Sequence, residues 1–286
     1  MRPEPVARGD PMKKRVISCI VLILSMLVCL FLSKWTRLLF FTLAGLFCAY
    51  EYSHGMEDLD VHCSLWVLVV YLIGQALLAG HQFKLTAGSV WFIGCVYLAL
   101  LSGILRQRVK GNGALDTVAG LTYPCMLFGV LLYISVTEIW LETVAIACLA
   151  SWTCDSFALF GGTRFGKHKV APAISPNKTV EGCICGALAS LVAGLLVWLI
   201  GKACGGTFLG NPYQSFSLGL CLFTAFFSST LGQMGDLVES LIKRMIGIKD
   251  FSDLIPGHGG MFDRADSLLF AIPTAYFCIK LYLGRL

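Results

Sequence analysis

The C-terminal part of the sequence holds polar residues whose types and spacing suit chemistry on phosphate groups. If residues 232–246 form a helix, Asp236, Ser240 and Lys243 lie at positions i, i+4 and i+7, on one face of that helix. Glu239 falls beside this face, four residues before Lys243, which is the spacing at which a helix pairs a carboxylate with an ammonium group. The pattern predicts a helix face that carries both signs of charge.

A second acidic pair opens the last apolar stretch of the chain. Asp263 and Asp266 are i, i+3 neighbours, and Arg264 follows Asp263 directly. Together with Asp236 and Glu239 they make four carboxylates among cations. Such a set suits a hard cation with oxygen ligands, such as Mg²⁺, and suits it best where substrate phosphates complete the ligand shell.

Asp155 lies inside an otherwise apolar run, about one and a half helical turns before Gly161. An ionisable group at that depth in a membrane costs a few kcal/mol and normally faces a cavity or a partner. We favour a functional role, while an ion pair with Arg164 or a cap on a neighbouring helix is the structural alternative.

The segment at residues 161–182 could bind an anion. Its glycines would let the backbone approach a ligand closely. Thr179 or Asn177 is a suitable N-cap for the apolar run that follows, and Glu181 falls in its first turn. A helix N-terminus with free N–H groups beside Lys178 would attract a phosphate. The basic residues of this segment could equally be ordinary charges that set the orientation in a membrane.

A glycine-rich turn at residues 256–260 contains His258. This histidine could act as a general base, hydrogen-bond a phosphate, or simply pack the turn. We favour binding over proton transfer.

The elements that must position these residues are apolar helices. Hydrophobic residues make up 57% of the 286 positions and charged residues only 14%, with a mean hydropathy of +0.76, whereas water-soluble domains carry about 25% charged residues. The apolar residues form long unbroken runs, which indicate helices rather than the alternating strands of a barrel. The runs are Val16–Ser33, Leu38–Tyr50, Leu65–Ala79, Val90–Leu105, Val118–Val136, Ile139–Phe160, Val180–Ile200, Leu218–Leu231 and Ser267–Leu283.

We therefore predict an all-α, polytopic integral membrane protein with about nine transmembrane helices. Residues 1–15 would form a cytoplasmic tail, residues 16–137 the N-terminal transmembrane helices that select the lipid, and residues 138–286 a C-terminal catalytic core.

Basic residues concentrate in the N-terminal tail and in the loops after the fourth, sixth and eighth runs. The positive-inside rule then places the N-terminus and the polar segments in the cytoplasm. The net charge of +5 reflects this topology and attraction to anionic lipid, and it gives no indication of a nucleic-acid partner. The acidic stretch Glu51–Asp60 departs from the basic pattern, and we interpret it as a solvated turn.

Three polar segments, in this order, resemble the signature of the CDP-diacylglycerol synthases, also called phosphatidate cytidylyltransferases. They read DSFALFGG at 155–162, SPNKTVEG at 175–182 and SLIKR-x4-KD-x-S-x2-IP-x-HGG-x2-DR-x-D at 240–266. The resemblance is close from about Asp155 onward, whereas the first half is similar only in consisting of apolar helices.

The resemblance implies that CTP and phosphatidic acid react to give CDP-diacylglycerol and pyrophosphate at the cytoplasmic surface of the inner or plasma membrane. It also implies a homodimer in the lipid bilayer. Mg²⁺ would be held by Asp236 and Asp263, with a second cation near Asp266. The catalytic residues would be Asp236, Asp263, Lys243 and Arg264. The substrate-binding residues would be Asp155, Arg164, Ser175, Asn177, Lys178, Thr179, Glu181, Arg244 and His258.

Two rival functions share some of these features. A transporter or channel would also bury Asp155 and open helices with charged residues, but it would not need a glycine–histidine turn beside paired aspartates. A cytidylyltransferase for an isoprenoid phosphate, or a lipid kinase, would share the CTP-binding half.

Overall fold

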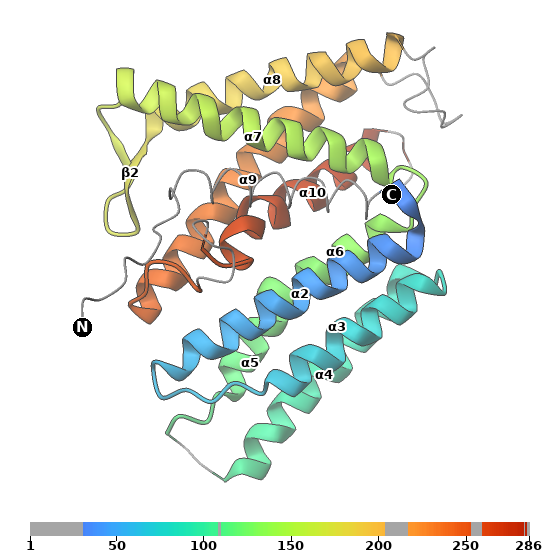
Figure 1. Ribbon diagram of the computed structural model, residues 1–286, viewed down its shortest axis with the longest axis vertical. Helices are drawn as coiled ribbons and strands as arrows, with labels where there is room; N and C mark the ends of the chain where they lie inside the picture. The colour runs from blue at the N-terminus through green and yellow to red at the C-terminus, as the bar shows by residue number, and fades with distance from the viewer. Residues whose placement is uncertain (1–30, 108–109, 204–216, 253–258, 283, 285–286) are drawn as a thin grey trace, which may run out of the picture.

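The computed structural model describes residues 31–107, 110–203, 217–252, 259–282 and 284. Long helices make up nearly all of this part of the chain, and a short two-stranded hairpin joins two of them (Figure 1). The elements in chain order are α2 (Lys34–Glu57), α3 (Leu65–Gly80), α4 (Leu85–Arg106), α5 (Ala114–Gly120), the π-helical segment η1 (Leu121–Cys125), α6 (Met126–Ser135), α7 (Trp140–Phe165), β1 (Lys169–Ala171), β2 (Ser175–Thr179), α8 (Val180–Ala203), α9 (Leu218–Ile246) and α10 (Phe262–Tyr282).

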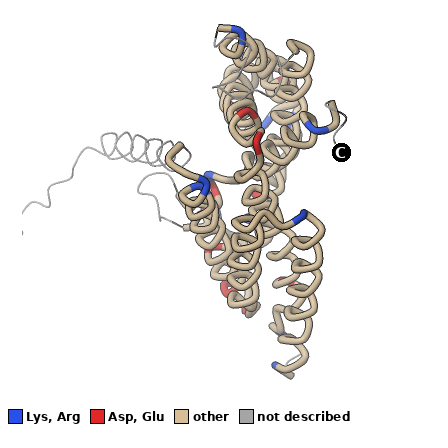
Figure 2. The backbone as a smooth tube through the Cα atoms, turned by 90° about the vertical axis from the view of Figure 1, so that its right-hand side faces the viewer, with Lys and Arg blue, Asp and Glu red and all other residues tan. Residues whose placement is uncertain are grey.

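The predicted apolar runs from residue 38 onward fall on described helices, and charged residues are sparse along them (Figure 2). The first run, Val16–Ser33, lies almost wholly outside the described residues. Five helical segments in the described part are long and apolar enough to cross a membrane: α4, the continuous segment Ala114–Ser135, α7, α8 and α9. The helix α3 is apolar but shorter. The structure therefore shows a mostly helical protein with several candidate spans, and the total of nine stays a prediction.

The helices form two groups that share α10. One hydrophobic core unites side chains of α2, α3, α6 and α10, while a second cluster unites α7, α8 and α9. In Figure 1, α2–α6 make up one layer and α7 and α8 lie at the far side of α9 and α10. Because α10 contacts both α9 and α6, it connects the N-terminal helices to the C-terminal ones.

The helix α7 continues past Gly161 to Phe165, beyond the predicted end of its apolar run. A Cβ atom added at Gly161 would lie 2.5 Å from the Cβ of Cys185 on α8, and one at Gly182 would lie 2.7 Å from the carbonyl oxygen of Ala158 on α7. Because small residues let two helices approach closely in a membrane, we assign these glycines to helix packing rather than to ligand approach.

The connection from α7 to α8 is an antiparallel hairpin, which an all-α prediction leaves out. Ala171 pairs with Ser175, and Lys169 pairs with Thr179. The strands have only three and five residues and are largely exposed, so they carry no alternating apolar pattern that would reveal them in the sequence.

The helix α9 is continuous over 29 residues, from an N-cap at Ser217 to a left-handed C-cap at Gly247. It packs against α10 at Gly235, where an added Cβ atom would lie 2.6 Å from the carbonyl oxygen of Asp266. This close approach places the polar face of α9 directly beside the first turns of α10.

Candidate active site

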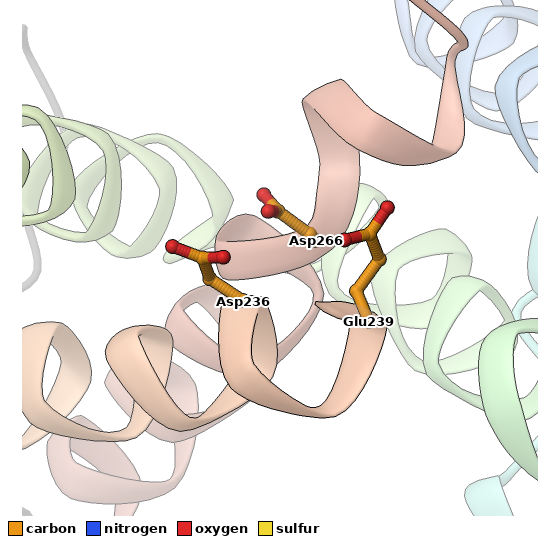
Figure 3. Close-up of side chains that lie close together, drawn as sticks. All are labelled: Asp236, Glu239 and Asp266. Carbon is orange, nitrogen blue, oxygen red and sulfur yellow. The ribbon is translucent and has the colours of Figure 1, made fainter. Parts of the chain in front are cut away.

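Three carboxyl groups from α9 and α10 lie close together (Figure 3). Asp236 and Glu239 come from α9 and Asp266 from α10, and an oxygen of each lies within 4.8 Å of the other two. Glu239 is 1% exposed, and its Oε1 has no hydrogen-bond partner among the described residues. We refer to Asp236, Glu239 and Asp266 as the open cluster.

The chemistry of the open cluster fits a divalent cation. Asp266 precedes the apolar part of α10, and burial, together with the negative charge of Asp236, raises the pKa of its carboxyl to about 7. Carboxylates this close disfavour one another's ionised form unless a proton or a cation lies between them. Since Mg²⁺ prefers carboxylate oxygens as protein ligands, the open cluster is the candidate metal site.

Lys178 brings a positive charge to the edge of this cluster. Its Nζ lies 2.5 Å from Oδ2 of Asp236. The next residue, Thr179, is the N-cap of α8, because its Oγ1 accepts the N–H of Gly182 at 3.2 Å. The first N–H of α8 already donates to the carbonyl oxygen of His168 at 2.9 Å. The first N–H of α8 is therefore engaged within the protein, and the Lys178 Nζ is itself buried against Asp236.

Asp263 lies in a different setting from the open cluster. Its Oδ1 accepts a hydrogen bond from Lys243 Nζ at 2.8 Å, and its Oδ2 accepts the backbone N–H groups of Phe251 at 3.1 Å and Gly260 at 2.9 Å. Lys243 Nζ is also 2.8 Å from Oε2 of Glu239, which confirms the predicted helix pair. We refer to Asp263, Lys243 and these two backbone groups as the closed network.

The closed network keeps Asp263 ionised. Burial alone would raise the pKa of this carboxyl, but its interactions with Glu239 and Lys243 and the hydrogen bond from the Gly260 N–H lower the pKa below the ordinary value. Both oxygens of Asp263 are already engaged, and Asp263 is not among the three carboxyl groups whose oxygens lie within 4.8 Å of one another. Lys243 nevertheless links it to Glu239 of the open cluster. Sequence spacing alone could not distinguish Asp263 from Asp266, because both open the same helix.

Glu51 is a residue of this region that sequence reasoning missed. It is 2% exposed, and its Oε1 accepts the Ser252 hydroxyl at 2.5 Å and the Met261 N–H at 2.9 Å, while its Oε2 accepts the Phe262 N–H at 2.8 Å. The interpretation of Glu51–Asp60 as a solvated turn is therefore wrong up to Glu57, because α2 continues to that residue and buries Tyr52 and Ser53 as well as Glu51. An acidic residue at the end of an apolar run was the only sequence signal, and it gave no hint of a partner some 200 residues away.

The hairpin residues lie beside the cluster and are organised by Glu181. This carboxylate accepts the backbone N–H groups of Lys167 at 3.1 Å and His168 at 3.2 Å, and it contacts His168 Nδ1 at 2.6 Å. Glu181 thus holds the entry to β1 in place. Ser175 and Asn177 both lie on β2, where Asn177 is exposed directly before Lys178.

The arginine side chains that were predicted to bind substrate differ in whether they already bind other protein groups. Arg244 donates through Nε to the Ile174 carbonyl oxygen at 3.3 Å and through Nη1 to that of Ile248 at 3.0 Å, so it ties the hairpin tip to the end of α9. Arg164, in the last turn of α7, and Arg264, in the first turn of α10, are both exposed.

Asp155 lies on α7 and interacts electrostatically with both Asp236 and Lys178. The structure therefore places Asp155 close to Asp236 and Lys178, at the same site as the open cluster. His258 lies outside the described residues, and its predicted role stays untested.

A family model described as "Cytidylyltransferase family" matches residues 13–282. The chain belongs to this family. Membership confirms the resemblance that the three polar segments predicted, and it extends the family match over the N-terminal helices as well.

Relatives within the cytidylyltransferase family include proteins with a named activity. The phosphatidate cytidylyltransferase of Bacillus subtilis (strain 168) is 36% identical over 192 residues, which are 65% of this chain and 67% of that protein. The phosphatidate cytidylyltransferase of Staphylococcus aureus (strain COL) is 41% identical over 133 residues, 46% of this chain and 47% of that protein. The matched segments thus span two thirds of the first relative and about half of the second.

Proposed function

We propose that this chain is a phosphatidate cytidylyltransferase, which transfers the cytidylyl group of CTP to phosphatidic acid and releases CDP-diacylglycerol and pyrophosphate. The observation that carries the proposal is the convergence of Asp236, Glu239 and Asp266 beside Lys178, in a chain of the cytidylyltransferase family. The names of the bacterial relatives support the choice of CTP and phosphatidate as substrates.

The reaction needs charge neutralisation and alignment more than proton transfer. The second pKa of a phosphate monoester is about 6, so phosphatidic acid is largely a dianion at pH 7 and needs no general base. One of its phosphate oxygens bonds to the α-phosphorus of CTP, the bond from that phosphorus to the bridging oxygen breaks, and pyrophosphate leaves. The protein must hold the two anions in line while their charges approach.

The protein residues divide this task by their positions. Lys178, whose Nζ is buried against Asp236, is assigned to the triphosphate, together with its neighbour Asn177 and with Arg164 at the end of α7. Arg264 is exposed at the start of α10 and meets the phosphate of phosphatidic acid. Lys243 and Arg244 are already bound to protein groups, so they position the site rather than supply a free charge.

Asp236 and Asp266, with Glu239 behind them, are the residues that would hold Mg²⁺. When bound there, Mg²⁺ would supply positive charge to neutralise the phosphate charge that the lysines and arginines leave uncompensated. Asp263, which the sequence assigned to the same ion, would instead orient Lys243 and the start of α10. A second cation near Asp266 stays a prediction.

The site lies at the cytoplasmic surface in this proposal, with nine spans and a cytoplasmic N-terminus. The site is formed by the C-terminal ends of α7 and α9 and the N-terminal ends of α8 and α10, all on the side to which the basic loops assign the cytoplasm. Single cysteines at Lys110 and Lys249, in an otherwise cysteine-free background, should be labelled from the cytoplasmic side. Labelling of either from outside would overturn the orientation.

The substrate pair can be tested with purified protein in detergent. CTP labelled at the α-phosphate is mixed with phosphatidic acid, an isoprenoid phosphate or diacylglycerol, and the lipid products are separated by chromatography. We expect the α-phosphate label to appear in a lipid product when phosphatidic acid is the acceptor and not with the other two lipids, and we expect pyrophosphate to be released. In a parallel reaction with CTP labelled at the γ-phosphate, transfer of label to lipid would indicate a lipid kinase. Preference for the isoprenoid phosphate would indicate a different cytidylyltransferase. Either result overturns the proposal. Sedimentation of the same preparation tests the predicted homodimer.

A further inference from the structure

Glu51 connects the N-terminal helices to the segment that leads into α10. It stands near the end of α2, yet its carboxylate accepts the hydroxyl of Ser252, at one edge of that segment, and the N–H groups of Met261 and Phe262, at the other edge. A carboxylate that accepts three such bonds in a buried position is held strongly, because hydrogen bonds to an ionised acceptor are about twice as strong as neutral ones. Glu51 therefore binds both ends of this connection at once.

Gly260 shows how closely this carboxylate packs. A Cβ atom added at Gly260 would lie 2.7 Å from Glu51 Oε1 and 2.9 Å from its carboxyl carbon. The backbone N–H of Gly260 points the other way, to Asp263. The start of α10 is thus enclosed between two carboxylates, Glu51 from α2 and Asp263 from α10 itself.

The position of α10 matters for the reaction because Asp266 lies on it. Phe262 is the first residue of α10 and donates to Glu51, and Asp266 follows one helical turn later. A shift of the first turn would move Asp266 relative to Asp236 and Glu239 on α9. Catalysis is sensitive to such shifts, since a displacement of about 1 Å can cost roughly 100-fold in rate.

We propose that Glu51 is a positioning residue of this enzyme, which fixes the first turn of α10 from the N-terminal helices and so sets the geometry of the open cluster. The proposal rests on the proposed function for its catalytic consequence, but its structural part can be observed without substrate. It assigns part of the active-site geometry to the half of the chain whose sequence carries no recognisable catalytic motif.

The test compares Glu51→Gln with Glu57→Gln, a control at an exposed position of the same helix whose carboxylate pairs with exposed His54. Glutamine keeps the size of the Glu51 side chain. It replaces one carboxylate oxygen with an NH₂ group, which cannot accept the hydrogen bonds made to that oxygen. At a temperature well below melting, we expect Glu51→Gln to lower kcat at least about 10-fold and to raise the Mg²⁺ concentration needed for half-maximal rate, with the KM for CTP changed less than about threefold. Glu51→Asp should recover part of kcat, and Glu57→Gln should match the wild type.

Hydrogen exchange of the peptide that contains Met261 and Phe262 gives a readout that needs no activity. Exchange there should be faster in Glu51→Gln than in the wild type and unchanged in Glu57→Gln. Ser252→Ala, which removes one of the three donors, should show smaller effects in the same direction and serves if Glu51→Gln does not fold. Wild-type kcat with unchanged exchange in Glu51→Gln, or a lowered melting temperature with wild-type kcat, would overturn the proposal. If the wild-type chain shows no CTP–phosphatidate activity, the proposed function fails, while the exchange result still decides whether Glu51 fixes α10.

Discussion

Asp263 and Asp266 stand one turn apart at the start of α10, and the protein places them in opposite settings. Asp263 belongs to the closed network, where Lys243 and two backbone N–H groups use both of its oxygens. Asp266 belongs to the open cluster, where its neighbours are other carboxyl groups and where Glu239 keeps an oxygen without a hydrogen-bond partner in the described part of the chain. The comparison teaches that, of two aspartates one turn apart, the one whose two oxygens both accept donors from other segments serves the fold. The other, whose Oδ1 accepts from its neighbour Ser267 and which faces other acids, is the candidate cation ligand.

The largest effect should come from the open cluster. Asp236→Asn keeps the shape of the side chain but removes one anionic ligand and the partner of Lys178. We expect activity to fall at least about 100-fold, by analogy with the loss of one preorganised electrostatic group, while the melting temperature in detergent barely changes. The measurement is formation of labelled CDP-lipid across a Mg²⁺ titration. Normal melting with near wild-type rates at low Mg²⁺ would remove Asp236 from the metal site.

The closed network should respond in stability as well as in rate. Asp263→Asn leaves Lys243 and the N–H groups of Phe251 and Gly260 with a weaker acceptor. Hydrogen bonds to charged groups contribute about 1.5–3 kcal/mol each, so we expect a clearly lower melting temperature, in contrast to Asp236→Asn. The two variants are compared in the same detergent. Equal melting of both, with equal loss of rate, would show that the sequence was right to put Asp263 on the ion.

Lys178 and Arg264 should affect the two substrates differently, because Lys178 lies beside the open cluster and Arg264 lies beside the closed network. Lys178→Ala, next to the open cluster, should raise the KM for CTP several-fold more than that for phosphatidic acid. Arg264→Ala, next to Asp263, should do the opposite, because its exposed guanidinium is available to the lipid phosphate. Steady-state kinetics with each substrate varied in turn measures both constants. Equal changes for both substrates in both variants would mean that this division of the site is wrong.

The smallest effect should come from Ser240, which donates a long hydrogen bond of 3.4 Å to Asp236 Oδ1. A typical net hydrogen bond contributes about 0.5–1.5 kcal/mol, and a long one belongs at the low end. Ser240→Ala should therefore lower kcat by only about two- to threefold and leave the Mg²⁺ dependence unchanged. A loss as large as that of Asp236→Asn would show that Ser240 itself contacts the ion or a substrate.

Local patterns in the sequence predicted much of this structure. The apolar runs located the helices, the spacing of Glu239 and Lys243 predicted their ion pair, and Thr179 was one of two expected N-caps. These features depend on residues within one or two turns of each other, where helical geometry fixes which side chains meet. For the same reason, the sequence correctly predicted which residues form the polar face of α9, without indicating which segments that face contacts.

Features that depend on contacts between distant segments could not be predicted in this way. Glu51 meets residues about 200 positions away, and nothing in its local sequence indicates them. The glycines of α7 resemble a ligand-binding loop in sequence, whereas only the neighbouring helix reveals that Gly161 serves packing. Sequence spacing does not distinguish Asp263 from Asp266. The backbone N–H groups of Phe251 and Gly260 do, because they bind Asp263.

In the proposed orientation, the length of α9 places the site near the cytoplasmic boundary of the bilayer. Asp236 is the nineteenth of its 29 residues, which places it about 27 Å along the axis from Leu218 at 1.5 Å per residue. The hydrocarbon layer is about 30 Å thick, so a helix that enters at the outer boundary carries this carboxylate to the inner one, where acyl chains give way to headgroups. Under the proposed function, a phosphatidic acid molecule would then react at its resting depth in the leaflet, and diffusion within the plane of the membrane would be enough to supply the enzyme with lipid.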